Sequence, residues 1–200
     1  MARVSGMKEK LHMPIYDAFF VQANGGRNTL PQAMTDPRML RFFVDVQNKT
    51  RLETNLQAAG VLPSLNSFEA RAMRVIVSSL KEVEDQQAEV VFLADLIYNS
   101  VTSLLVGEKV MIEMPTFWFP AGAGVSPGQG VGSLTAIVQN HGEPNHLNTF
   151  RFAEPVFIES QQNFRVEMAF PQGLPPSVEH ALGPYRIWVV LDGYLTRDVQ

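Results

Sequence analysis

Two histidines and a glutamate within six positions are the residues of this chain that best fit metal chemistry. They are His141, Glu143 and His146, in the stretch HGEPNH. Imidazole nitrogens and carboxylate oxygens are common ligands of divalent metals. A cupin-type site places ligands two positions apart on a strand and adds one from a distant strand, whereas here glycine and proline separate the ligands. We therefore interpret the stretch as a polar surface turn and expect no bound metal or other cofactor.

The sequence carries no catalytic pattern. It has four histidines but no nucleophile elbow that would place a serine for a catalytic triad. The glycine-rich stretch 122–132 lacks the lysine and the serine or threonine that end a phosphate-binding loop. The absence of cysteine excludes a disulfide framework, a thiolate metal site and a cysteine nucleophile. We expect that the protein is not an enzyme.

Aromatic side chains are more informative than the ionisable ones. Phe117, Trp118 and Phe119 are consecutive between two prolines. Such a cluster can stack on sugar rings, or it can pack in a core or an interface. The flanking prolines and a neighbouring methionine are typical of burial, so we interpret the cluster as core or interface.

The elements that must position these residues are β-strands. From Phe164 to Phe170 large apolar residues alternate with Arg165 and Glu167, which is the period of a half-buried strand. An apolar run at 147–158 precedes it across a polar SQQN turn, and we expect the two runs to form an antiparallel pair. A sheet with one apolar face needs a second layer, which predicts a β-sandwich.

Eight or nine short strands with unequal connections are predicted, together with one short helix. Unequal connections favour a mainly β fold of the jelly-roll or Greek-key type, an antiparallel β-sandwich, over an up-and-down barrel. The helix is expected within residues 88–98 and is followed by a strand from Val101 to Val106. We expect an N-terminal arm with the first strand at residues 1–54, and the sandwich domain at 55–200.

The predicted arm is irregular, apolar and basic. It contains Tyr16, Phe19 and Phe20, and should therefore lie across a surface of its own body or of another copy. Residues 1–51 hold eight of the 16 lysines and arginines but only four of the 20 acids. A basic arm can contact nucleic acid, although these charges are dispersed and an arm that is merely solvated is the simpler interpretation.

The last apolar run has two partly apolar faces. Between Tyr185 and Leu191, Trp188 and Val190 lie on the face opposite to the main apolar one. A sandwich strand normally has one wet face. Trp188 and Val190 must therefore be covered, either by the arm of the same chain or by a second subunit, because an exposed patch of this kind marks an interaction site.

A family resemblance rests on four stretches. They are the apolar N-terminal arm, AGVLPSLNSF before a strand, the PTFWFPAGAG loop, and LNTFRFAEPVFIESQQNFRVEMAF before GPYRIWVVLDGYLTRDVQ. Their arrangement resembles structural proteins of bacterial viruses with jelly-roll sandwiches. The resemblance implies a capsid, penton or decoration component that assembles symmetrically, without catalysis or cofactor.

We therefore expect a virion structural protein, assembled in the host cytoplasm, that binds copies of itself and other virion proteins. The alternative is a carbohydrate-binding or cupin-like β-sandwich that binds a receptor or glycan. Contact of the basic arm with nucleic acid stays open, and no apolar run reaches the roughly 18 residues of a membrane span. The residues expected at the oligomer interface are Tyr16, Phe19, Phe20, Phe117, Trp118, Phe119 and Trp188.

Overall fold

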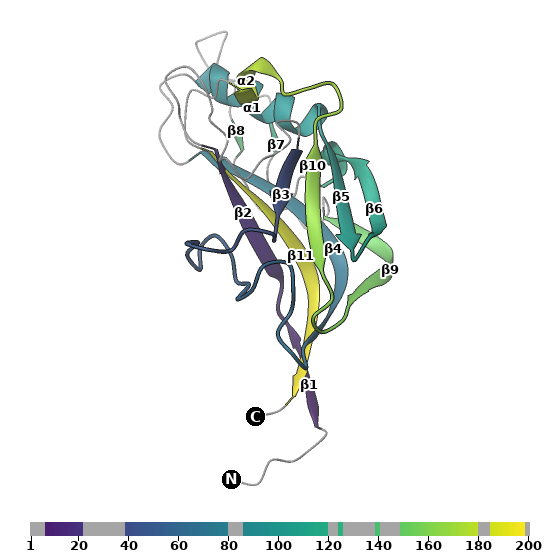
Figure 1. The fold of residues 1–200 in the computed structure, drawn as a ribbon. Helices are drawn as coiled ribbons and strands as arrows, with labels where there is room; N and C mark the ends of the chain where they lie inside the picture. Colours follow the sequence, from purple (N-terminus) through teal and green to yellow (C-terminus); the bar gives the residue numbers. More distant parts are fainter. Residues whose placement is uncertain are drawn as a thin grey trace.

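A computed structural model describes residues 7–21, 39–79, 86–119, 124–125, 139–140, 149–179 and 185–198. In this part of the chain two antiparallel sheets pack face to face, and helices lie at one end (Figure 1). His141, Glu143 and His146 lie outside the described residues, as does most of the glycine-rich stretch, so their interpretation stays a prediction.

The larger sheet is organised around the last strand. Its strands are β1 (Lys8–His12), β2 (Ile15–Val21), β4 (Ser67–Ser79), β9 (Phe150–Ile158) and β11 (Tyr185–Asp198). Their order is β1-β11-β4-β9, and β2 also pairs with β11. β2 pairs with the N-terminal half of β11 and β1 with its C-terminal half, so both lie along the same edge of β11.

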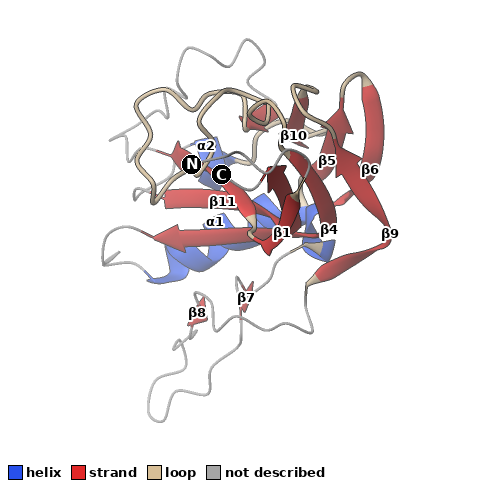
Figure 2. Cartoon of the chain, turned by 90° about the horizontal axis from the view of Figure 1, so that it is seen from below, coloured by secondary structure: helices blue, strands red, loops and turns tan. Residues whose placement is uncertain are grey.

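The smaller sheet has the order β3-β10-β5-β6. Its strands are β3 (Met39–Phe42), β10 (Phe164–Ala169), β5 (Val101–Val106) and β6 (Lys109–Pro115). The remaining elements are α1 (Gln86–Tyr98), the single 3-10 turn η1 (Thr116–Trp118), α2 (Pro176–Glu179), and the paired two-residue strands β7 (Gly124–Val125) and β8 (Gln139–Asn140). Figure 2 shows β7 and β8 apart from the two main sheets.

The predicted mainly β, antiparallel sandwich is confirmed. The chain crosses repeatedly between the five-stranded and the four-stranded sheet. The order β1/β2-β11-β4-β9 facing β3-β10-β5-β6 is compatible with a jelly roll, which combines two Greek keys. The predicted helix is α1, which begins at Gln86, and the predicted strand after it is β5.

The predicted pairing of residues 147–158 with 164–170 is wrong. β9 pairs with β4 in the larger sheet, whereas β10 lies between β3 and β5 in the smaller one. The connection between them therefore crosses from one layer to the other, with Gln161 at a positive φ of 60°. Alternating apolar residues suit both arrangements, because each strand turns one face to the core in either case.

The expected N-terminal arm is also corrected. β1 and β2 are strands of the larger sheet, so residue 54 does not mark a boundary between an arm and a sandwich. The alternating run MLRFFVDV at residues 39–46 predicts the first strand, but β3 ends at Phe42, because Phe43 has a positive φ of 70° and its N–H donates to the Asp17 carboxylate. Such a φ is unusual outside glycine and ends the extended backbone at β3.

The core lies between the sheets and is closed at one end by α1. In β10, Phe164, Val166 and Met168 are buried, as the alternation predicts. Phe92 of α1 stacks on Tyr185 of β11 with ring centroids 3.8 Å apart. The helix thus covers the end of the sandwich that lies opposite β1 (Figure 1).

Candidate binding surface

Three neighbouring aromatic side chains remain exposed where α1 and η1 meet. Tyr98 is 71% exposed, Trp118 53% and Phe117 44%. The ring centroids of Tyr98 and Phe117 are 6.1 Å apart, those of Phe117 and Trp118 6.0 Å, and each pair is tilted by only 30°. We call these three side chains the aromatic row. It continues at Trp118 onto Phe150 of β9, at 6.5 Å.

The geometry of η1 explains why only two of the three consecutive aromatics are exposed. Pro115 ends β6 and leads into a single 3-10 turn, which has three residues per turn. Residues three apart therefore share a side, and Thr116 and Phe119 both face the interior with no exposed surface. Phe117 and Trp118 fall on the opposite side, towards solvent.

A buried hydroxyl cluster lies beneath the row and consists of Ser100, Thr102 and Thr116. The Thr116 hydroxyl oxygen is 2.6 Å from that of Ser100 and 2.8 Å from that of Thr102. Ser100 also bonds the Leu96 carbonyl of α1, and its own carbonyl accepts from the Thr116 N–H at 2.9 Å. Because a buried hydroxyl is costly without a partner, this cluster fixes the end of α1 against η1.

Phe119 ties the same turn to the larger sheet. Its carbonyl accepts from the N–H of Val75 in β4, and its N–H donates to the Thr116 carbonyl, both at 2.9 Å. Its ring meets Phe150 edge-on at 5.4 Å. The aromatic row therefore rests on fixed elements, and a rigid aromatic surface loses little conformational entropy when it binds a partner.

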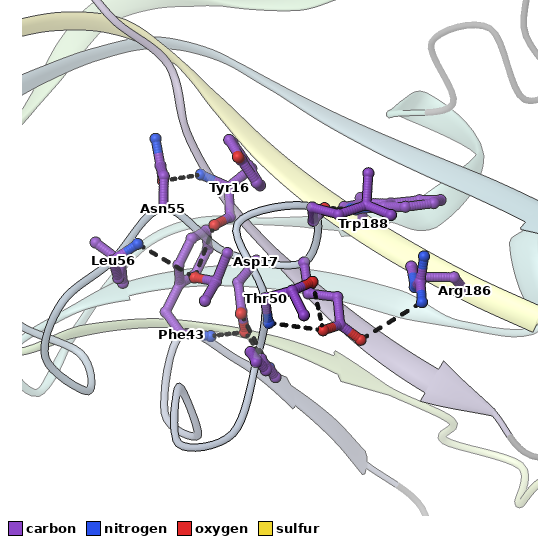
Figure 3. Close-up of polar contacts among 12 residues, drawn as sticks. Tyr16, Asp17, Phe43, Thr50, Asn55, Leu56, Arg186 and Trp188 are labelled. Atoms are coloured by element: carbon purple, nitrogen blue, oxygen red, sulfur yellow. Dashed lines mark hydrogen bonds and ion pairs between the residues drawn. The ribbon is translucent and has the colours of Figure 1, made fainter.

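A second aromatic region lies on the outer face of the larger sheet, around Trp188. Residues 49–56, which we call the strap, pass over this face (Figure 3). The indole N–H of Trp188 donates to the Leu52 carbonyl at 3.0 Å. Arg186 lies 5.4 Å from the Trp188 ring centroid, and its guanidinium is 3.5 Å from the Glu53 carboxylate. Trp188 is half-buried, covered by its own chain.

The strap is anchored by a buried carboxylate on β2. Asp17 accepts from the Phe43 N–H at 2.7 Å, and both of its oxygens lie 2.9 Å from the Lys49 ammonium (Figure 3). Burial raises the pKa of Asp17, while Lys49 and the hydrogen bonds act in the opposite direction. The anchor is therefore a charge pair inside the protein, where removing one partner is expensive.

The turn of the strap is held by Glu53. The N–H of Thr50 donates to its carboxylate at 2.9 Å, and the Thr50 hydroxyl lies 3.0 Å away. The hydrogen bond from the Thr50 N–H holds the pKa of Glu53 below its ordinary value, and Arg186 adds to this. Glu53 thus needs its charge to hold the strap in this shape.

The structure separates the residues that were expected at an oligomer interface. Phe119 is fully buried within the chain, so its placement at an interface is wrong. Phe19 packs inwards against Phe42 at 6.3 Å. Tyr16 donates its hydroxyl to the Arg51 carbonyl, and Trp188 is covered by the strap. Exposed surface remains at Phe20, Phe117 and Trp118.

Tyr98 is a member of the row that sequence reasoning missed. It closes the run 88–98, whose apolar residues fit a helix and a strand about equally. Tyr98 lies beside Phe117 because it is the last residue of α1. The one feature of the sequence that could have indicated this end of the helix is the polar pair Asn99-Ser100, which directly follows Tyr98.

Among the residues that the structure describes, no three His, Asp or Glu side chains are grouped so that they could hold a metal ion. In the same residues, no helix is long and apolar enough to cross a membrane. Comparison of the chain with family models, characterised proteins and solved structures gives no match.

Proposed function

We propose that this protein is a structural subunit that assembles with copies of itself through the aromatic row. The observation that carries the proposal is the exposure of three adjacent rings on a base fixed by buried hydroxyl groups. A contiguous apolar patch on the surface of a folded chain marks an interaction site. Aromatic side chains are also the residues that most often dominate the energy of interfaces.

A role in a virion, as a capsid, penton or decoration component beside other virion proteins, belongs to the same proposal. It is supported by the sequence resemblance and by a strand order compatible with a jelly roll. Because one fold serves many functions, the row and not the sandwich carries the argument. The N-terminal strands and Trp188 add no support, since their contacts are made within one chain.

Assembly by addition of strands at the sheet edges is less well supported. β6, an outer strand of the smaller sheet, carries Lys109 and Pro115 at its ends, and its pairing with β5 is interrupted by a register shift. β9, an outer strand of the larger sheet, contains Pro155 and a similar shift opposite β4. Charges, prolines and bulges are the features that keep edges from pairing.

Carbohydrate binding is the second candidate, and a different observation favours it. The rings of the row are tilted by only 30° from one another, so they present a nearly continuous face. The exposed side chain of Asn99, held by the Asp95 carbonyl at 3.1 Å, lies next to Tyr98 in the chain. An aromatic face with a neighbouring amide can stack on a neutral sugar ring and bond its hydroxyl groups.

Light scattering after size-exclusion chromatography tests the assembly proposal. The wild-type chain should self-associate as its concentration rises, and Phe117→Ser with Trp118→Ser should return it to a monomer. Phe157→Ser is the matched control, because Phe157 is 59% exposed on β9 but lies outside the row. A wild-type chain that stays monomeric at high concentration would contradict the proposal. Binding of a neutral oligosaccharide that Trp118→Ala abolishes would favour the second candidate.

A further inference from the structure

An outer strand of a sheet is open to pairing with another chain unless something occupies its free edge. Among the described strands, β2 pairs with β11 alone. In an antiparallel pair, alternate residues direct both N–H and C=O to the same side. Since the N–H and C=O of Tyr16 point away from β11, towards the strap, those of Ala18 and Phe20 share this direction.

The strap occupies part of this edge with a side chain in place of a strand. The Oδ1 atom of Asn55 accepts from the Tyr16 N–H at 3.0 Å (Figure 3). Its Nδ2 group donates to the Pro14 carbonyl at 2.8 Å. The Tyr16 carbonyl accepts from the Asn55 N–H at 3.4 Å and from the Thr54 hydroxyl at 3.1 Å. An amide side chain offers the same donor and acceptor as a peptide group, so Asn55 satisfies the edge as a neighbouring strand would.

Contacts made by the residues that precede Asn55 in the strap hold it at the edge. The backbone of Thr54 forms an isolated antiparallel β-bridge with Asp17. The Asp17 carboxylate also binds Lys49 of the strap. The strap then covers the outer face, where the Leu52 carbonyl accepts from Trp188. One continuous segment thus covers the edge of β2 at Tyr16 and Asp17 and the outer face beside it.

The chemistry of β2 indicates what this segment excludes. Ile15–Val21 reads IYDAFFV, which combines high β-propensity with a single charge and no proline. Segments of this kind pair readily with copies of themselves when they are exposed. The single charge is Asp17, which the strap neutralises through Lys49. Phe20, 36% exposed on the same strand, offers an apolar side chain to such a copy.

We propose that the strap is a guard, an autoinhibitory contact that prevents a second copy of this chain from pairing along β2. This inference goes beyond the assembly proposal, because it concerns another surface and predicts suppressed association there. Removing the Asn55 side chain should free the Tyr16 N–H, loosen the strap at this point and open the edge to a neighbouring β2.

The test uses a background with Phe117→Ser and Trp118→Ser, in which the aromatic row cannot drive association. Into it Asn55→Ala is introduced, with Gln57→Ala as the control on an exposed neighbouring position. Hydrogen exchange of the Tyr16 amide should become about tenfold faster in Asn55→Ala, because the amide loses its acceptor. Light scattering should show association in Asn55→Ala but not in Gln57→Ala, and added Phe20→Lys should reverse it by placing a charge on the edge.

Two results would overturn the proposal. If Tyr16 exchanges faster while the chain stays monomeric at every concentration, the strap is a structural loop and no guard. If Tyr16 exchange is unchanged, Asn55 does not fasten the edge. Should Asn55→Ala fail to fold, Asn55→Leu takes its place, because it has a similar shape but removes both the acceptor for Tyr16 and the donor to Pro14, so the same two measurements apply. A monomeric wild type would end the assembly proposal alone, because the comparison made here does not involve the row.

Discussion

The two tryptophans of the chain lie in contrasting surroundings. Trp188 is half-buried, and its indole N–H is bonded to the strap of the same chain. Trp118 is 53% exposed at the end of a row of exposed rings. The chain thus covers one aromatic region with a dedicated segment and leaves the other open on a fixed base. This difference is the reason for assigning intermolecular contact to Trp118.

The energies involved make that difference meaningful. An aromatic side chain can bury about 150–250 Å², and burial of apolar surface is worth about 25 cal/mol per Å². Leaving three such side chains partly exposed therefore forgoes several kcal/mol of stability, against a total of about 5–15 kcal/mol for a typical domain. A partner that covers the row would recover part of this free energy.

The largest expected effect concerns the anchor of the strap. Asp17→Ala should lower the free energy of unfolding by about 3 kcal/mol, because it leaves Lys49 and the Phe43 N–H without their buried partner. Asp17→Asn should cost clearly less, since it keeps an acceptor for Phe43 and burial already disfavours the charge. Urea unfolding measures both. Equal losses would show that the charge pair, and not the acceptor, holds the strap.

The next effect compares the two tryptophans directly. Trp188→Ala should lower the free energy of unfolding by about 2 kcal/mol, through lost packing and the lost bond to Leu52. Trp118→Ala should lower the stability of the monomer by less than about 1 kcal/mol, because the side chain is exposed. Urea unfolding at low protein concentration measures both. A larger loss for Trp118→Ala would reverse the comparison.

A smaller effect is expected beneath the row. Thr116→Val should lower the free energy of unfolding by about 1–2 kcal/mol, because the Thr102 hydroxyl loses a buried partner. The same change should weaken self-association, since η1 carries two rings of the row. Sedimentation equilibrium measures the second effect, with Thr50→Val as a control in the strap. Unchanged association would show that the hydroxyl cluster does not support the row.

The smallest effect is a dependence of the strap on pH. Because the pKa of Glu53 is lower in the folded chain than its ordinary value of 4.5, the folded state binds this proton more weakly than the unfolded state. The stabilisation from Glu53 is therefore complete above pH 4.5 and is lost as the pH falls through the folded pKa. The stability difference between wild type and Glu53→Gln should shrink between pH 7 and pH 3. Asp17, whose pKa is raised, acts in the opposite direction but is present in both chains, so its effect cancels in their difference. A difference independent of pH would contradict the role of Glu53.

Local pattern in the sequence was enough to predict the layers of the fold. The alternation at Phe164–Phe170 predicts β10 and its buried face, and the apolar runs predict α1 and β5. Strand pairing was beyond its reach, because the five-residue connection after β9 fits a hairpin as well as a crossing between sheets. The strap was missed for a related reason: Asn55 acts through hydrogen bonds to residues about 40 positions away, and no local pattern encodes them.

The candidate site was predicted only in part. Phe117 and Trp118 are exposed, so an interface at these two residues stays a prediction. The burial of Phe119 depends on the three-residue period of the 3-10 turn, which no pattern in the sequence predicts. Tyr98 joins Phe117 and Trp118 only because the C-terminal end of α1 lies next to η1 in the folded chain. Interfaces expected at Tyr16, Phe19 and Trp188 followed from counting apolar residues, which cannot tell cover by the same chain from cover by another copy.

Fluorescence of single-tryptophan chains tests the central claim most directly. Trp188→Phe leaves Trp118 as the only tryptophan, and Trp118→Phe leaves Trp188 while keeping an aromatic ring in the row. We predict that acrylamide quenching of Trp118 falls as the protein concentration rises, while quenching of Trp188 stays constant. Quenching of Trp118 that is independent of concentration, or protection of Trp188 instead, would contradict the assignment of the aromatic row as the surface between copies.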